Sequence, residues 1–270
     1  MLRLRLLTAS IGLPLILVAI AIGAPAFATL LAVVAAVSAF ELCHLAPGLR
    51  RGDPLVVLGI AWAAILALRY FVNSADLLAA GMALPLVLSL VLMLPKGDRR
   101  PGFTAWSWTV AAALYVGWLL GHWGGLYRMH DGVALVLFGM LVTFAYDTGA
   151  FFTGRRFGRH KLSPGISAGK TWEGVAGGVA LALCVGLLVR LVTLHLGHGF
   201  PLSAGLTPAT AVLLAVVAQL GDLVESALKR SASIKDAGVI LPGHGGMLDR
   251  FDSLLFTGTM LYFVSLWTGM

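Results

Sequence analysis

Charged residues are scarce in this chain of 270 residues. Asp, Glu, Lys and Arg make up only 11% of it, whereas 59% of the residues are hydrophobic. Soluble globular domains carry about 25% charged residues, so the composition excludes an ordinary soluble protein. Cysteine is also sparse: Cys43 and Cys184 lie in apolar stretches and are too few for a disulfide framework or a cysteine metal cage. Long low-complexity tracts, short-period repeats and the phosphate-binding pattern GxxxxGKS or GxxxxGKT are all missing.

Long apolar runs recur along the whole chain instead. A run of roughly 20 apolar residues is long enough to cross a bilayer as a helix, and helices satisfy their own backbone hydrogen bonds in lipid. We therefore expect one all-α, polytopic integral membrane domain over residues 1–270. Glycine and proline break the runs into about nine predicted transmembrane helices, at 8–23, 25–44, 54–72, 76–95, 103–122, 132–153, 172–196, 207–228 and 251–269.

The basic residues favour one orientation of these helices. The chain has 19 Lys and Arg residues. If the N-terminus is in the cytoplasm, all of them lie on the cytoplasmic side except Arg69, Arg128 and Arg190. Cytoplasmic loops of membrane proteins carry such an excess. We attribute the net charge of +7 to this topology and expect no nucleic-acid partner. An alternative reading of the basic and apolar N-terminus, with its APAFA sequence, is a signal peptide.

Ionisable residues gather where the last two predicted helices meet the cytoplasm. Gln219, Asp222, Ser226 and Lys229 are spaced by 3, 4 and 3, which places them on one helical face. Asp249 and Asp252 open the final helix and repel each other unless a cation lies between them, and Mg²⁺ prefers such oxygen ligands. Two alternatives stay open: an interfacial charge stripe, and capping of the final helix by its acids. Capping does not explain Asp222.

Two cytoplasmic segments are long and polar, at about 154–171 and 229–250, so residues 132–270 carry the motifs and 1–131 few. Lys229, Arg230 and Lys235 can neutralise a polyphosphate. His244 is weak as a site residue, because a lone loop histidine is more often structural or solvated. The basic tail of the first segment can equally bind substrate or anchor to anionic headgroups. Asp147 lies inside the preceding predicted helix.

The stretch Ser226 to Asp252, SALKRSASIKDAGVILPGHGGMLDRFD, resembles the signature of the phosphatidate cytidylyltransferases, the CDP-diacylglycerol synthases. The upstream blocks DTGAFFTGRRFGRHKLSP, KTWEG and QLGDLVES are also similar to blocks of that family. One departure is SAGKT before the Trp-Glu-Gly, where the family often has Ser-Pro-Lys-Lys-Thr. The specific motifs cover residues 147–253, and the N-terminal half matches only as a set of hydrophobic spans.

The resemblance implies an activity and a set of residue roles. The family joins CTP to phosphatidic acid, gives CDP-diacylglycerol and pyrophosphate, and requires a divalent metal, normally Mg²⁺, with a second cation left open. The implied metal ligands are Asp222 and Asp249, with Asp252 as a third ligand or as a residue that supports the ligands from behind. Lys229 completes the implied catalytic set. The implied substrate-binding residues are Asp147, Lys170, Ser226, Arg230, Lys235, Asp236, His244 and Arg250. The implied partners are CTP, phosphatidic acid and the bilayer of the cell membrane, with the active site facing the cytoplasm; family members also form homodimers.

Two other functions fit parts of the pattern. A polyprenol kinase that uses CTP would share the nucleotide and Mg²⁺ but would transfer the γ-phosphoryl group. A proton- or ion-coupled transporter would use the acids as an intramembrane path, although transporters often contain inverted repeats and the acids here crowd into the C-terminal half.

Overall fold

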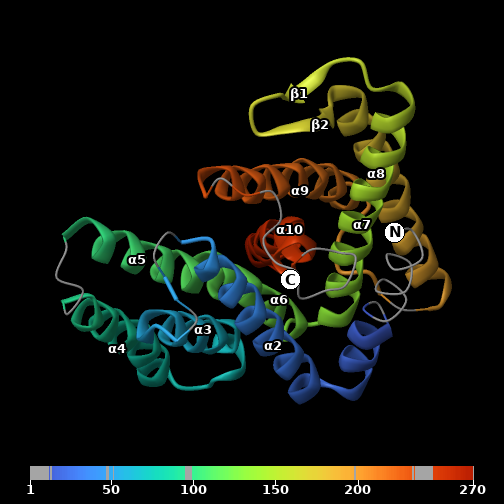
Figure 1. Cartoon of the computed structure of the whole chain (residues 1–270). Helices are drawn as coiled ribbons and strands as arrows, with labels where there is room; N and C mark the ends of the chain where they lie inside the picture. The colour runs from blue at the N-terminus through green and yellow to red at the C-terminus, as the bar shows by residue number, and fades with distance from the viewer. Residues whose placement is uncertain are drawn as a thin grey trace. The chain divides into compact units, whose positions relative to one another are not determined.

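Helices form nearly all of the described structure (Figure 1). The computed structural model describes residues 12, 14–46, 49–50, 52–94, 99–197, 199–232, 234 and 246–269. The chain divides into two units, one made of Met1–Gly124 with Ser231–Phe251 and the other of Gly125–Arg230 with Asp252–Met270. The predicted site residues Lys235, Asp236 and His244 lie outside the described residues.

The first unit contains the N-terminal helices. They are α2 (Ala24–His44), α3 (Pro54–Ala67), the short 3-10 turn η1 (Arg69–Phe71), α4 (Ala75–Met93), α5 (Arg99–Ala111), the π-helical turn η3 (Ala112–Trp118) and the start of α6 (Leu119–Tyr127). Local chemistry sets several of the helix starts. Asp53 accepts a hydrogen bond from the amide of Leu55 and precedes a proline, and Ser74 accepts one from the amide of Leu77. Both are the cap residues that helix N-termini prefer.

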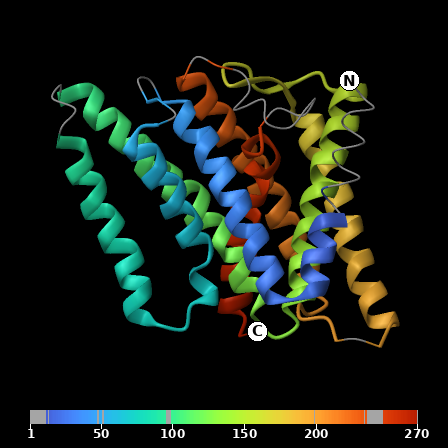
Figure 2. The ribbon, with the colours of Figure 1, turned by 60° about the horizontal axis from the view of Figure 1, so that its bottom comes forward.

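The second unit contains the C-terminal helices and a small hairpin. Its elements are α7 (Gly132–Phe157), β1 (Lys161–Ser163), β2 (Ser167–Thr171), α8 (Trp172–His195), α9 (Leu206–Ser231) and most of α10 (Leu248–Trp267). Helices α7 and α8 lie side by side (Figure 2). Glycine makes this contact close, because a Cβ added at Gly149 would lie 2.7 Å from the carbonyl oxygen of Gly177. Small residues allow such approach between membrane helices.

Much of the predicted span pattern is confirmed. Among the described residues, six helices are long and apolar enough to cross a membrane: Ala24–His44, Ala75–Met93, Gly102–Tyr127, Gly132–Phe157, Trp172–His195 and Leu206–Ser231. The chain is thus a polytopic membrane protein. Helix α3 has only 14 residues, and the predicted span at 8–23 lies partly outside the described residues. The number of nine crossings therefore stays a prediction.

The segment predicted as a polar loop at 154–171 has a structure of its own. Helix α7 continues through Phe157, which is beyond the predicted end at 153, and an antiparallel hairpin follows. Lys161 pairs with Thr171 and Ser163 with Ser167 in that hairpin. Thr171 then caps α8 by accepting a hydrogen bond from the amide of Gly174. The short hairpin is the only correction to an all-helical description within the residues that the structure covers.

Candidate active site

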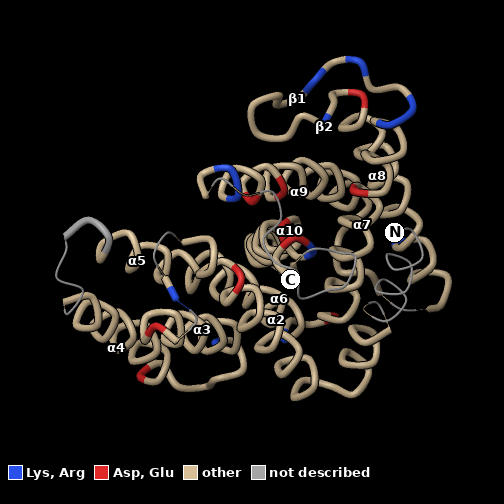
Figure 3. Tube along the Cα trace, in the orientation of Figure 1, with Lys and Arg blue, Asp and Glu red and all other residues tan. Residues whose placement is uncertain are grey.

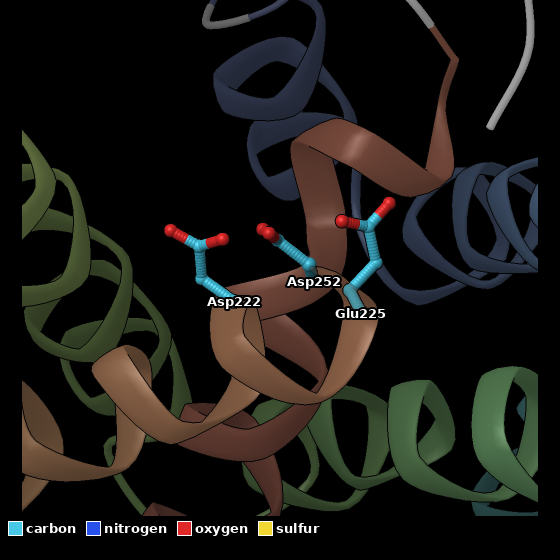
Figure 4. Close-up of side chains that lie close together, drawn as sticks. All are labelled: Asp222, Glu225 and Asp252. Atoms are coloured by element: carbon cyan, nitrogen blue, oxygen red, sulfur yellow. The ribbon is translucent and has the colours of Figure 1, made fainter. Parts of the chain in front are cut away.

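Three carboxylates meet in the second unit. Asp222 and Glu225 project from α9 and Asp252 projects from the first turns of α10, so that their side chains gather in one place (Figure 4). One oxygen from each lies within 4.8 Å of the others. Carboxylate oxygens in this number suit a hard divalent cation such as Mg²⁺. The group is thus a candidate metal site, and the structure adds Glu225 to the predicted ligands Asp222 and Asp252.

Close packing of α9 against α10 brings these acids together. A Cβ added at Gly221 would lie 2.7 Å from the carbonyl oxygen of Asp252, so a side chain at this position would push the helices apart. The hydroxyl of Ser253 donates a hydrogen bond of 3.2 Å to the carbonyl oxygen of Ala218. On α9, Asp222 and Glu225 are three residues apart and therefore share a face.

Two lysines neutralise part of this negative charge. The ammonium of Lys170 lies 2.7 Å from Asp222 Oδ2, and that of Lys229 lies 2.5 Å from Glu225 Oε2. The side chain of Glu225 is only 1% exposed, and those of Lys170 and Lys229 are 16% and 13% exposed. A buried carboxylate is costly unless it is paired. Among the described residues, the three carboxylates outnumber these two paired ammonium groups by one, a balance that suits a further cation.

Other polar side chains of α7 and α9 surround the cluster. The Ser226 hydroxyl donates to Asp222 Oδ1 at 3.4 Å, and the Tyr146 hydroxyl donates to Gln219 Oε1 at 2.7 Å. Asp147 is exposed on α7, and its charge is close enough to act on Asp252. The hydrogen bond thus places the predicted residue Ser226 beside Asp222, whereas Asp147 is related to the cluster only through the interaction of its charge with that of Asp252.

The hairpin presents Lys170 to Asp222 from its second strand. At its base, Glu173 accepts hydrogen bonds from the amide of Arg159 at 3.1 Å and from the Nδ1 nitrogen of His160 at 2.6 Å. The guanidinium of Arg230, on α9, donates to the carbonyl oxygen of Ile166 at 3.3 Å. Lys and Arg gather around this hairpin and at the C-terminal end of α9 (Figure 3). The hairpin is therefore attached to α9 by the ion pair of Lys170 with Asp222 and by the hydrogen bond from Arg230 to Ile166.

Two predicted site residues that the structure describes, Asp249 and Arg250, belong to the first unit. Asp249 Oδ2 accepts a hydrogen bond of 2.7 Å from the amide of Gly246, and Arg250 is exposed on the first turn of α10. The role of Asp249 as a metal ligand stays a prediction. The backbone hydrogen bond agrees with the capping alternative.

Sequence reasoning missed two buried acids. Glu225 carries a readable signal, because it follows Asp222 by three residues on a helix whose polar face was already recognised. Glu41 carries none. It lies in an apolar run near the N-terminus, yet its carboxylate accepts the amides of Met247 and Leu248, more than 200 residues further along the chain.

Comparisons with known proteins indicate the family of the chain. The model of a family described as the cytidylyltransferase family matches residues 3–267. A protein of Bacillus subtilis named phosphatidate cytidylyltransferase is 34% identical over 263 residues, which are 96% of each chain. Proteins of the same name from Staphylococcus saprophyticus and Brucella suis are 44% identical over 131 and 132 residues, about half of each chain. The chain therefore belongs to the cytidylyltransferase family.

Proposed function

We propose that this chain is an enzyme that transfers CMP from CTP to phosphatidic acid, giving CDP-diacylglycerol and pyrophosphate for phospholipid synthesis. The observation that carries the proposal is the family match over nearly the whole chain, joined to a cluster of acids and lysines in a polytopic membrane protein. The name of the relatives, phosphatidate cytidylyltransferase, supplies the substrate class.

In this reaction the protein mainly positions the substrates and neutralises their charge. A phosphate oxygen of the lipid forms a bond to the α-phosphorus of CTP, the bond from that phosphorus to the bridging oxygen breaks, and its electron pair leaves with pyrophosphate. A phosphate monoester is already largely ionised at neutral pH, so no general base is required. Lys170 and Lys229 lie where their ammonium groups can balance phosphate charge. Such preorganised electrostatics is commonly the largest part of enzymatic rate enhancement.

Asp222, Glu225 and Asp252 are the residues that would hold Mg²⁺, with Asp249 kept as a predicted ligand. When bound, the ion would supply neutralisation of phosphate charge and alignment of the phosphate oxygens. Ser226 orients Asp222 through its hydroxyl, and Lys229 balances Glu225. Arg230 is close enough to the hairpin to hold it beside the nucleotide. Arg250, Lys235, Asp236 and His244 are kept as predicted substrate-binding residues.

The proposal includes an orientation in the membrane. The distribution of basic residues supports an N-terminus in the cytoplasm, with the hairpin and the end of α9 on the same side. CTP is a soluble cytoplasmic nucleotide, and a lipid substrate can enter sideways while its acyl chains stay in the bilayer. The proposed location is therefore the cell membrane, with the active site towards the cytoplasm. A homodimer is expected from the family resemblance alone.

A lipid assay tests the function directly. Purified full-length protein in detergent receives Mg²⁺, phosphatidic acid and CTP labelled at its α-phosphate. We expect the label in a lipid product and release of unlabelled pyrophosphate. If the α-label stays in released CDP and a γ-label enters the lipid, the protein is a CTP-dependent lipid kinase. If no nucleotide reacts but the protein moves ions across vesicle membranes, the acids serve transport and the proposal is wrong.

A further inference from the structure

A buried glutamate lies in the first unit, away from the predicted motifs. Glu41 is on α2 and is 2% exposed. Its neighbours on that helix are almost all apolar. An ionisable group inside a membrane span is expensive and is therefore usually paired and tied to function. The groups that Glu41 contacts indicate what it does.

The carboxylate of Glu41 holds the first amides of α10. Oε1 accepts a hydrogen bond of 2.9 Å from the amide of Met247, and Oε2 accepts one of 2.8 Å from the amide of Leu248. The first amides of a helix have no partner within the helix. A negative charge at this end is also stabilised by the helix dipole. The usual cap comes from a residue adjacent in sequence, whereas this one comes from another helix.

The turn before α10 is shaped to admit this carboxylate. A Cβ added at Gly246 would lie 2.5 Å from Glu41 Oε2, a distance that real side chains do not show. The amide of the same glycine donates to Asp249 Oδ2 at 2.7 Å. Two carboxylates thus hold one short turn. Glu41 accepts the amides of Met247 and Leu248, and Asp249 accepts the amide of Gly246.

We propose that Glu41 is a positioning residue for the cytidylyltransferase reaction. It fixes the first turn of α10 and thereby the direction of Asp249, which follows Leu248 directly, and of Asp252, one helical turn further along. In this role Glu41 acts through the backbone of α10 and not through a contact with substrate or metal. The inference rests on the proposed function, because Asp249 and Asp252 matter for turnover only if they serve that reaction. Glu41 connects the N-terminal half, which carries few motifs, to the most motif-rich segment of the chain.

The test compares Glu41→Gln with a matched variant, Ser38→Ala, in purified full-length protein. Ser38 is fully buried one turn earlier on α2 and carries no role in the site. Gln keeps the size of Glu, but its NH₂ group replaces one of the two carboxylate oxygens. One backbone amide of the turn then faces a donor and loses its acceptor. We expect amide exchange at the start of α10 to become about tenfold faster and kcat to fall about tenfold, since a charge-assisted hydrogen bond is lost. The KM for CTP should stay within about twofold, because the nucleotide contacts are not removed.

Two further variants separate positioning from mere stability. Glu41→Asp keeps the charge with a shorter reach, so it should recover part of the kcat that Glu41→Gln loses. Gly246→Ala displaces the carboxylate from the other side, so the double variant with Glu41→Gln should lose little more than either single variant. The proposal also predicts that Glu41→Gln raises the Mg²⁺ concentration needed to shift the thermal unfolding temperature of the protein in the absence of nucleotide.

Specific results would overturn the proposal. They are unchanged exchange at the start of α10 in Glu41→Gln, losses that multiply in the double variant, or an equal loss of kcat in Ser38→Ala at an equal drop in thermal stability. Failure of the proposed function is distinguishable from these, because wild-type protein would then form no CDP-diacylglycerol, whereas the exchange measurement would still report whether Glu41 holds the turn.

Discussion

The two units pair their carboxylates with different kinds of partner. In the first unit, both oxygens of Glu41 accept backbone amides. In the second unit, Asp222 and Glu225 face the side-chain ammonium groups of Lys170 and Lys229. Backbone amides at a helix start cannot leave without unwinding the helix, whereas a lysine on a long flexible stem can turn to another partner. The comparison separates acids that hold structure from acids whose partners are exchangeable, which is what a metal and nucleotide site requires.

Asp249 tests this comparison most severely, because it is a predicted ligand and also accepts a backbone amide. Asp249→Asn keeps an oxygen for the amide of Gly246 but removes the charge. We expect turnover in the lipid assay to fall by more than about 100-fold with normal membrane insertion, because loss of a metal ligand should exceed the effect of a supporting residue. Asp76→Asn, an exposed acid in the first turn of α4, is the control. Wild-type-like activity of Asp249→Asn at ordinary Mg²⁺ would leave Asp249 only the capping role.

The roles of Glu225 and Lys229 can be distinguished by whether a variant changes the Mg²⁺ requirement or the use of CTP. Glu225→Gln should lower kcat about 10- to 100-fold and raise the Mg²⁺ concentration for half-maximal activity. Lys229→Met should instead weaken the use of CTP, with a smaller change in the Mg²⁺ requirement. Titrations of Mg²⁺ and of CTP on both variants make the distinction. Identical effects on the two titrations would mean that the pair is only a structural ion pair.

Lys170 should contribute less to turnover than the acids, because its ammonium group pairs with only one of them, Asp222. Lys170→Met is expected to raise the KM for CTP about tenfold, since one ammonium contact to phosphate is lost. Lys161→Met is a matched control on the other strand of the same hairpin, where the side chain is exposed. Steady-state kinetics with CTP as the varied substrate measure both. An equal rise in KM for the two variants would assign the effect to the net charge of the hairpin.

The smallest effect is expected at a backbone-held acid far in sequence from the cluster. Asp53 caps α3 by accepting the amide of Leu55 at 3.0 Å. Asp53→Ala should cost about 1 kcal/mol of stability, which is typical for loss of a helix cap, and should leave turnover per folded molecule unchanged. Thermal unfolding in detergent measures the loss, and Asp53→Asn should recover it because Asn also caps. A drop in kcat in fully folded Asp53→Ala protein would contradict the division into acids that hold structure and acids that serve the reaction.

Local pattern was sufficient to predict most of the helices and one face of the site. The apolar runs predicted the long spans because a bilayer demands about 20 apolar residues for each crossing helix. The spacing on α9 predicted that Asp222, Ser226 and Lys229 share a face, and the hydrogen bond from Ser226 to Asp222 agrees with this. The hairpin at 161–171 was not predicted, because strands of three and five residues with mixed polarity carry no clear alternation.

The sequence by itself determined that the chain is a polytopic membrane protein of the cytidylyltransferase family, since composition and a long contiguous motif are local properties. Tertiary structure alone decided which acids meet. Glu225 joins Asp222 and Asp252 because Gly221 lets α10 approach α9. Glu41 finds the amides of α10 because a helix start leaves donors that any nearby carboxylate can satisfy, whatever its distance along the chain. Such pairings depend on packing in space, and no periodicity in the sequence encodes them.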